Sequence, residues 1–567
     1  VYYGASSNMQ FKFNENNIHD LVNSGYVYAG YFYYNQGTST VNSEFKNNTF
    51  NKNKASSYVY GFQLNYCDYT AVDNNKFTNC ESGYIYYGFS VSYSLNSSIQ
   101  GNEFSGNKAS SYHYYTFRVY YSNNVNMKSN VMKNNESSNY FYYTFYIYYS
   151  NNVKHEDNEF SGNKTTNYFY YTNYIYYSTG LSMKNNKFVN NTTGNYWYYM
   201  HYMYQSTGMT IEGNVMSGNS ASYFYYSYYI YYSGGSLFKD NTITNNQASY
   251  GLYYTFYNYY SDNNKWDGNE FSKNIAQYVY YTFMDYYSSG STYINNLYYG
   301  NEGSYYIYYV WYVYQGDKVI IAHNTIDISY SPQYYIYPSY MYTNSGADFQ
   351  MKNNIWVING QAGYTTYLQY MPYYSDIEFA NNVYYSSTGA QFYTNTTQTF
   401  AQWVATTGET GAKNVDPKFV NRAGGDFTPT NPAIANMRLT GFASKDKIGS
   451  TRTACGPDPG ALEFFVDHSA SNMSSLPTAA CGGYSPQISI DFKNGTNVAM
   501  TNVPMFYSVN GASKTEYIAN AAASSTTSFT FATRPVFHTP GLNTVVVGLG
   551  CDDDPSNNTI TKTITIT

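Results

Sequence analysis

The chain has 567 residues, of which 21% are aromatic, 81 are tyrosine and only 11% are charged. The net charge is −6 and Arg118 is the only arginine in the first 400 residues, so a nucleic-acid partner is not expected. No apolar run approaches the roughly 18 residues of a membrane-spanning helix, so no membrane span is expected either. Because the chain begins at Val1 rather than Met, we expect a processed or trimmed chain.

The first part of the chain repeats the motif Asn-x-apolar-x-x-Asn in thirteen copies, spaced 27 to 30 residues apart. Clear copies read NEFSGN at 102–107 and 158–163, and in one variant Cys80 replaces the second Asn. Each repeat contains a short strand-like piece, a tyrosine-rich strand-like piece and turns rich in Gly, Ser, Thr and Asn. A period of this length made only of strands predicts an all-β parallel β-helix (solenoid) of about 13 coils over residues 1–395.

The paired asparagines predict a ladder along the turns. Stacked coils place equivalent residues above one another, so each side-chain amide can bind the one in the next coil. Asparagine acting only as a turn former fits the same pattern, and both interpretations make these residues structural. The predicted ladder residues are Asn102, Asn107, Asn130, Asn135, Asn158, Asn163, Asn186, Asn191, Asn214 and Asn219.

The tyrosine strands predict a core face and an outward face. In YFYYTFYIYYS (140–150), the columns of Phe145 and Ile147 are apolar and are expected to face the core. Tyr143 shares their parity and is assigned to the core or to a corner, whereas the Thr144 column is expected outward among tyrosines. The predicted outward contact face consists of Tyr114, Tyr142, Tyr146, Tyr148, Tyr170, Tyr174, Tyr176, Tyr198, Tyr202, Tyr204, Tyr225, Tyr229 and Tyr231.

Three interpretations of that face remain open. Tyrosine favours strands and stacked rings support one another, so the face could be structural filler. It could instead contact another copy or a neighbouring subunit, because so large an aromatic patch marks an interface. As a third interpretation, it could be a glycan-binding or adhesive face, on which rings stack against sugars.

The tyrosine pattern ends near residue 395, and NVDPKFVNRAGGDFTPTNPAIANM (414–437) and CGPDPGALEFF (455–465) follow. This segment resembles the C-terminal cap of secreted right-handed parallel β-helix proteins of Bacteroidota, in the pectate-lyase-like superfamily. The resemblance implies a β-helix with a cap at 396–466 and a location outside the cell, at its surface. It implies no single activity, because the superfamily includes lyases, hydrolases and adhesins. Matching residues are Asp416–Phe419, Gly425–Phe427, Pro432–Ile434 and Gly460–Phe464, and Asp458-Pro459-Gly460 departs from the family's Asp-Ile-Gly.

A linker at 467–486 precedes short alternating strands at 487–567. These strands resemble an immunoglobulin-like domain of the bacterial cell-adhesion-related type, which usually acts as a spacer or connector. Cys455 and Cys481 flank a loop-rich segment and could form a disulfide in an oxidising compartment. None of the five cysteines has the spacing of a zinc site, and CDDDP (551–555) is interpreted as a polar loop rather than a calcium site.

Candidate catalytic residues are sparse. Glu103, Glu159 and Glu270 occupy one repeated position, which is typical of a solvated column rather than a catalytic pair. Asp285 and His201 fall singly in inward columns, and Asp285 has no obvious partner. We therefore expect no catalytic site, no cofactor and no metal.

The sequence favours an extracellular structural or adhesive protein, part of a cell-surface fibre or filament. Its expected partners are copies of itself or neighbouring fibre subunits, and glycans are a further candidate. The alternatives are a carbohydrate-active enzyme (polysaccharide lyase or glycoside hydrolase) and a glycan-binding module.

Overall fold

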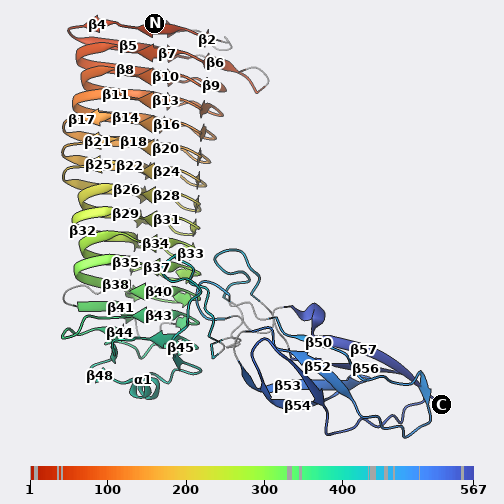
Figure 1. Cartoon of the computed structure of the whole chain (residues 1–567). Coiled ribbons are helices and arrows are strands. Elements are labelled where there is room, and N and C mark those ends of the chain that lie inside the picture. Colours follow the sequence, from red (N-terminus) through yellow and green to blue (C-terminus); the bar gives the residue numbers. More distant parts are fainter. Residues whose placement is uncertain are drawn as a thin grey trace.

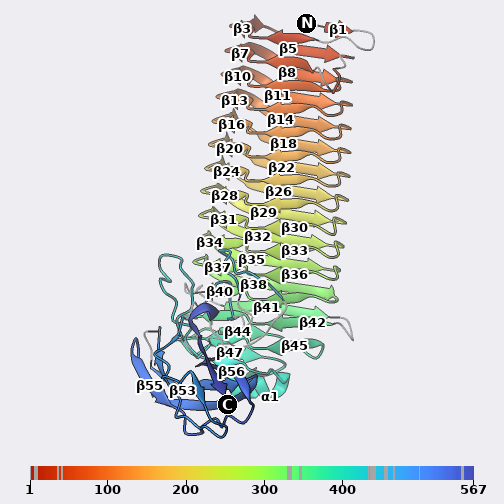
Figure 2. The same ribbon diagram turned by 90° about the vertical axis from the view of Figure 1, so that its right-hand side faces the viewer.

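The computed structural model describes residues 2–4, 11–34, 37–39, 42–328, 335–343, 348–431, 433–434, 442–452, 458–463, 467–496, 499–550 and 554–567. The chain forms a straight stack of parallel coils that ends in a short helix, followed by two small sheets (Figures 1 and 2). The predicted all-β parallel solenoid with a period of about 28 residues is confirmed, with about 14 turns.

One face of the solenoid is a 17-stranded parallel sheet, called the tyrosine sheet below. Its strands are β1 (Tyr2–Gly4), β4 (Val22–Asn23), β5 (Tyr26–Tyr33), β8 (Lys54–Asn65), β11 (Glu81–Ser92), β14 (Lys108–Tyr120), β17 (Glu136–Ser137), β18 (Tyr140–Tyr148), β21 (Lys164–Thr165), β22 (Tyr168–Tyr176), β25 (Thr192–Thr193), β26 (Tyr196–Tyr204), β29 (Ser220–Tyr231), β32 (Gln247–Tyr259), β35 (Ile275–Tyr286), β38 (Glu302–Gly316) and β41 (Tyr335–Thr343).

Two sheets of short strands complete each coil. The first short sheet contains β2 (Lys12–Asn14), β6 (Ser43–Lys46), β9 (Thr70–Asp73), β12 (Ser98–Gln100), β15 (Asn126–Lys128), β19 (Lys154–Glu156), β23 (Ser182–Lys184), β27 (Thr210–Glu212), β30 (Leu237–Lys239), β33 (Lys265–Asp267), β36 (Thr292–Ile294), β39 (Ile320–Ala322), β42 (Phe349–Lys352) and β45 (Ile377–Ala380). The second contains β3 (Asn17–His19), β7 (Thr49–Asn51), β10 (Lys76–Thr78), β13 (Glu103–Ser105), β16 (Val131–Lys133), β20 (Glu159–Ser161), β24 (Lys187–Val189), β28 (Val215–Ser217), β31 (Thr242–Thr244), β34 (Glu270–Ser272), β37 (Leu297–Tyr299), β40 (Thr325–Ile328), β43 (Ile355–Ile358), β46 (Val383–Tyr385) and β49 (Lys413–Asn414).

The core runs along the axis as stacked rows of identical or similar side chains. Strands β18 and β22 pair in parallel, with Tyr140 opposite Tyr168 and Ile147 opposite Ile175. In the three-residue strands the middle side chain points inward, as Phe160 does in β20. Because every coil repeats this pattern, each buried residue meets its equivalent one coil away, and the apolar rows become one continuous core.

Three rows of polar side chains line the corners of the coils. Asn130 donates its Nδ2–H to Oδ1 of Asn158 at 2.9 Å, and Asn135 donates in the same way to Asn163 at 2.9 Å. A serine row, which the sequence analysis missed, accepts backbone N–H groups across coils, as Ser150 Oγ does from Ser122. The buried asparagines of the two rows include Asn102, Asn107, Asn130, Asn135, Asn158, Asn163, Asn186, Asn191, Asn214 and Asn219.

The C-terminal end of the core is covered by α1 (Phe400–Thr407), which begins with a capping box of Thr399 and Gln402. Trp403 of α1 is fully buried beside a three-stranded sheet of β44 (Tyr367–Tyr370), β47 (Gln391–Tyr393) and β48 (Thr397–Gln398). The chain then returns along the outside of the coils, where Arg452 donates to Asn295 of the turn after β36 (Figure 1). The segment assigned to the cap therefore packs along the side of the solenoid as well.

The last part of the chain forms two small sheets around a core of its own. Cys481 is exposed with a free thiol, and Cys455 lies outside the described residues, so the structure gives no support to the predicted disulfide. The immunoglobulin-like assignment stays a prediction. The strands are β50 (Ser469–Ser471), β51 (Ala479–Ala480), β52 (Ser489–Lys493), β53 (Met500–Val509), β54 (Ala512–Ala521), β55 (Thr526–Thr530), β56 (Gly541–Leu549) and β57 (Thr559–Ile566), with a 3-10 helix η1 (Pro555–Asn557).

Among the described residues, no helix is long and apolar enough to cross a membrane.

Candidate functional site: the tyrosine face

The long strands of the tyrosine sheet depart from simple alternation at bends. In β18, Tyr142 and Tyr143 are neighbours and both lie half-exposed, whereas the next two residues, Thr144 and Phe145, are both buried. Two successive side chains can point the same way only where the strand bends. The alternation of inward and outward side chains therefore resumes on either side of the bend. The Tyr143 column is thereby resolved as outward. The prediction that the Thr144 column faces outward is wrong, since Thr144 is 2% exposed.

The outward tyrosines form six columns along the solenoid axis, named here after their members in or next to β18. The three columns that the sequence predicted contain Tyr114, Tyr142, Tyr170, Tyr198 and Tyr225 (Tyr142 column), Tyr146, Tyr174, Tyr202 and Tyr229 (Tyr146 column), and Tyr148, Tyr176, Tyr204 and Tyr231 (Tyr148 column). The structure adds a Tyr140 column, a Tyr143 column and a column at the turn after each strand.

Within a column most neighbouring rings stack almost parallel. The ring centroids of Tyr142 and Tyr170 lie 5.0 Å apart with an interplanar angle of 3°, and those of Tyr114 and Tyr142 lie 5.1 Å apart at 5°. Contacts between columns include edge-to-face pairs, as between Tyr143 and Tyr146 at 5.1 Å and 78°, and stacked pairs, as between Tyr146 and Tyr148 at 5.6 Å and 9°. Both geometries are the ones that aromatic pairs prefer, each worth about 0.5–1.5 kcal/mol beyond burial. The face is therefore a continuous aromatic lattice.

This stacking decides which part of each ring is open to a ligand. Carbon atoms in contact lie about 3.5–4.0 Å apart, so a sugar ring between two tyrosines would need about 7 Å. The observed spacing of 5.0 Å between Tyr142 and Tyr170 leaves no such gap. Strand side chains stand perpendicular to the sheet, so the lattice presents ring edges and phenolic hydroxyls to the outside.

The face is almost without charge. Burial raises the pKa of Tyr142 to about 12 and that of Tyr198 to about 12, so both phenols stay neutral at physiological pH. Among the described tyrosine strands, Arg118 is the charged side chain of this face, with its guanidinium 4.1 Å from the ring centroid of Tyr120. Alternating charges such as Lys108 and Glu136, 3.5 Å apart, lie at the edge where the long strands begin.

The turn after each long strand holds the sixth column, called the turn column below. Its members have left-handed backbone conformations, with φ of 47° at Tyr121, 47° at Tyr149 and 48° at Tyr177. A left-handed conformation costs a non-glycine residue roughly 1–2 kcal/mol, and bulky residues adopt it least. The other corners of the coils use Asn134 or Gly162 at comparable φ values. The repeated choice of tyrosine therefore has a cause other than backbone geometry.

The ionisable residues of the inward columns lie inside the solenoid, away from the outer surface. Asp285 and His201 are fully buried, as the inward columns predicted. The expectation that Asp285 lacks a partner is wrong, because Asn258 donates to its Oδ1 at 3.0 Å and Tyr293 donates to its Oδ2 at 3.1 Å. His201 shares a hydrogen bond of 2.9 Å with Asn173.

The repeated glutamates lie on the outer side of the second short sheet. Glu103 accepts from Ser105 at 2.8 Å and pairs with Lys133 at 3.2 Å, and Glu270 accepts from Ser272 at 2.7 Å. The carboxylates thus form a column at the surface, and each is held by hydrogen bonds or an ion pair with neighbouring side chains. No group of three or more His, Cys, Asp or Glu that could hold a metal occurs within the described ranges.

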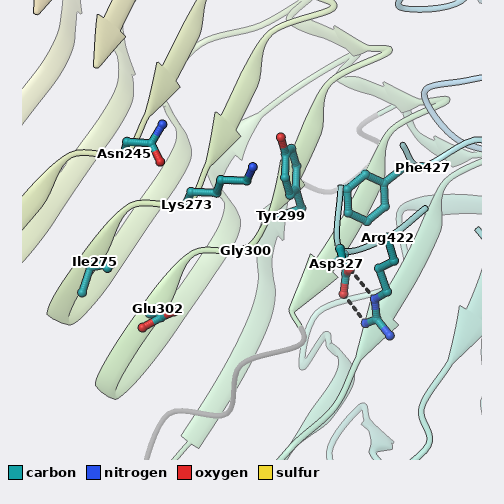
Figure 3. Close-up of a pocket in the computed structure, with 10 residues that line it drawn as sticks. Asn245, Lys273, Ile275, Tyr299, Gly300, Glu302, Asp327, Arg422 and Phe427 are labelled. Carbon is teal, nitrogen blue, oxygen red and sulfur yellow. Dashed lines mark hydrogen bonds and ion pairs between the residues drawn. The ribbon is translucent and has the colours of Figure 1, made fainter. Parts of the chain in front are cut away.

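A pocket of about 490 Å³ lies where the returning C-terminal segment meets the corner between β37 and β38 (Figure 3). Arg422 and Asp327 form a two-pronged ion pair at one end, with Nε 2.6 Å from Oδ2. The Lys273 ammonium lies 5.7 Å from the ring centroid of Tyr299, which packs on Phe427. No sequence pattern indicates this pocket, because it joins residues more than a hundred positions apart.

Comparisons with known proteins bear mainly on the fold. A family model described as "Right handed beta helix region" matches residues 1–192, and no curated protein matches the chain. A solved tailspike protein of E. coli bacteriophage HK620, in complex with a pentasaccharide, is 10% identical with a TM-score of 0.21, covering 90% of this chain and 86% of that one. A mutant of that tailspike with a hexasaccharide is 11% identical with a TM-score of 0.24, covering 95% and 86%. Scores this low carry no information on what this chain binds.

Proposed function

We propose that this chain is an extracellular, non-catalytic adhesive protein whose tyrosine face binds an uncharged polysaccharide lying along the solenoid axis. The observation that carries the proposal is the lattice of ring edges and neutral hydroxyls, repeated every 5.0 Å between Tyr142 and Tyr170. A linear polysaccharide offers a matching row of hydroxyl donors and acceptors, so one contact repeats coil after coil.

Hydrogen bonding supports a glycan over a purely apolar partner. A phenolic hydroxyl that loses water without gaining a hydrogen bond costs about 1–3 kcal/mol, and a column of them multiplies this cost. Sugar hydroxyls satisfy these groups, and the aromatic edges cover the C–H groups of the sugar rings. The near absence of charge on the face supports a neutral rather than an acidic polysaccharide.

The test removes hydroxyls and keeps rings, by combining Tyr142→Phe, Tyr170→Phe, Tyr198→Phe and Tyr225→Phe. Each lost net hydrogen bond is worth about 0.5–1.5 kcal/mol, so binding to cellulose, chitin or mannan should weaken by about 30-fold or more. Because the stacks stay intact, the melting temperature should not fall. Undiminished binding, or tighter binding to acidic polygalacturonate than to neutral glycans, would overturn the proposal.

Released reducing ends or unsaturated sugars from the same polysaccharides would show turnover and contradict the non-catalytic part. This assay uses the unchanged chain with each glycan. Binding without release of sugars is the expected result.

Self-association is the second candidate, and the extent of the aromatic face favours it. The Tyr142 column alone continues without a break from Tyr28 to Tyr337, far beyond the patch that a monomer usually exposes. The same four Phe substitutions separate the two functions, because a more apolar face strengthens contacts between copies while it weakens glycan binding. Sedimentation and electron microscopy of the protein without glycan give the readout.

A further inference from the structure

The turn column combines three properties that no other column has together. Its members occupy left-handed backbone positions, they lie at a corner, and they rank among the most exposed aromatic residues of the chain. Tyr93, Tyr121 and Tyr149 are 41%, 40% and 37% exposed. A strained conformation that recurs at one site points to a function served by the side chain.

The column consists of two runs separated by one natural gap. Six tyrosines form the first run and three form the second, while Gln205 takes the equivalent place between Tyr177 and Tyr232 with φ of 46°. Ring centroids of neighbours in a run lie 4.8–5.4 Å apart, with interplanar angles of 2–16°. The neighbouring pairs are Tyr34–Tyr66, Tyr66–Tyr93, Tyr93–Tyr121, Tyr121–Tyr149, Tyr149–Tyr177, Tyr232–Tyr260 and Tyr260–Tyr287.

We propose that the turn column is a site of oxidative cross-linking, at which a one-electron oxidant such as a peroxidase joins tyrosines of successive coils into dityrosine. Each phenol gives one electron to the oxidant and its hydroxyl proton to water. Two neighbouring phenoxyl radicals then form one C–C bond between their Cε carbons, the ring carbons ortho to the oxygens. The hydrogen on each bonded carbon moves to the oxygen, so two electrons and two protons leave for each bond formed.

The position of the turn column at a corner explains why it would react in preference to the columns in the middle of the tyrosine face. Exposed rings let an oxidant approach and let the proton leave to water, and a corner leaves room for the two rings to twist as the bond forms. Tyr146 has another column on each side, with Tyr143 edge-to-face at 5.1 Å and Tyr148 stacked at 5.6 Å. Tyr149 of the turn column lies at the corner and contacts the Tyr148 column, through Tyr148 and Tyr176. The resulting covalent bonds would cross-link each coil to the next along one corner of the solenoid.

The experiment treats the full chain, at a dilution that keeps it monomeric, with horseradish peroxidase and hydrogen peroxide. Cross-linked peptides are then identified by mass spectrometry. Bonds should join turn-column tyrosines one coil apart, such as Tyr121 with Tyr149, and none should join Tyr177 with Tyr232. Dominant bonds within one coil, such as Tyr148 with Tyr149, or equal yields in all columns would overturn the proposal.

Two variants use the natural gap as a matched control. Tyr149→Gln copies the residue that the chain already accepts at position 205, and it should reduce the seven neighbouring pairs to five. Gln205→Tyr should add bonds from position 205 to Tyr177 and to Tyr232. A Gln205→Tyr chain that melts like the natural protein but gains no such bond would contradict the proposal. Glycan binding by the Tyr142 column is measured separately, so failure of either proposal leaves the other standing.

Discussion

Asp285 shows how the solenoid accommodates an acidic residue in an apolar row. Burial raises the pKa of its carboxyl group from 3.8 to about 7, while hydrogen bonds from Asn258 and Tyr293 oppose that rise. Glu409 is a second case, since burial also raises its pKa to about 7 and its Oε1 accepts from Asn382 at the last rung of the asparagine ladder. Both residues are buried and accept hydrogen bonds inside the protein, and neither lies on the tyrosine face.

Asp285→Asn should make the chain less sensitive to rising pH. The folded chain holds the carboxyl proton more tightly than the unfolded chain, so the Asp285 contribution is complete below about pH 4 and is lost as pH rises to about 7. A pKa increase of about three corresponds to roughly 4 kcal/mol. The free energy of unfolding, measured by urea titration, should therefore fall by up to this amount in the natural protein relative to the variant.

Glu409 and the buried histidines also make the free energy of unfolding depend on pH, but they do so equally in the natural protein and in the Asp285→Asn variant. Burial lowers the pKa of His113 and of His155 to about 4, so their contributions rise with pH, but both proteins share them. Parallel pH profiles for the two proteins would show that the Asp285 carboxyl group is not buried as described.

At the scale of elements, the coil is held by its corners as much as by its strands. Asn163 donates to the Met132 carbonyl and to Asn191, and it accepts from the backbone and side chain of Asn135. One amide thus ties three coils together inside the protein. Most of the short strands have only three residues, so these bonds fix the register that the strands alone would leave weak.

Asn163→Ala should destabilise the solenoid strongly. It removes the acceptor of the Asn135 backbone N–H and of one Asn135 Nδ2–H, and it removes the side-chain donor to the Met132 carbonyl, at about 1–3 kcal/mol for each unsatisfied buried group. Asn191 keeps its bond from the backbone N–H of residue 163. We expect a loss of about 3–5 kcal/mol in the free energy of unfolding. Lys164→Ala, at the exposed next residue, is the control and should change it by less than about 0.5 kcal/mol. Equal effects of the two substitutions would show that the asparagine ladder does not stabilise the solenoid.

The period, the sheet class and the inward Phe145 and Ile147 columns follow from the sequence, because a repeat amplifies each weak local signal. The bend at Tyr142 and Tyr143 does not, since alternation assumes a straight strand. The turn column was missed although the recurring Tyr-Tyr-Ser after each strand marks it, because a bulky residue in a left-handed turn contradicts ordinary turn preferences. The pocket at Arg422 depends on where the C-terminal segment returns, which no local pattern encodes.

At the scale of the whole molecule, the returning C-terminal segment fastens the last coils together. Arg452 donates to Asn295 at 2.7 Å and to the Gly460 carbonyl at 2.8 Å, and it forms an ion pair with Glu463. Lys447 donates to the Gly268 carbonyl at 2.6 Å. Coils of a solenoid contact only their neighbours, so a clamp across several coils adds cooperativity that the repeat lacks. The rod can thus stay regular along its tyrosine face and rigid at its C-terminal end.

Arg452→Met should release this clamp and leave the tyrosine coils folded. The Arg452 side chain is 1% exposed and that of Glu463 is 7% exposed, so the substitution takes the guanidinium away from a buried carboxylate, at about 3–5 kcal/mol. Hydrogen exchange should accelerate in residues 442–452 and in β36, while β18 and β22 keep their protection, because they lie several coils away. Arg534→Met, at an exposed arginine of the C-terminal sheets, is the control and should change neither region. Loss of protection throughout the rod would mean instead that the clamp stabilises every coil, and that the solenoid folds as one unit rather than coil by coil.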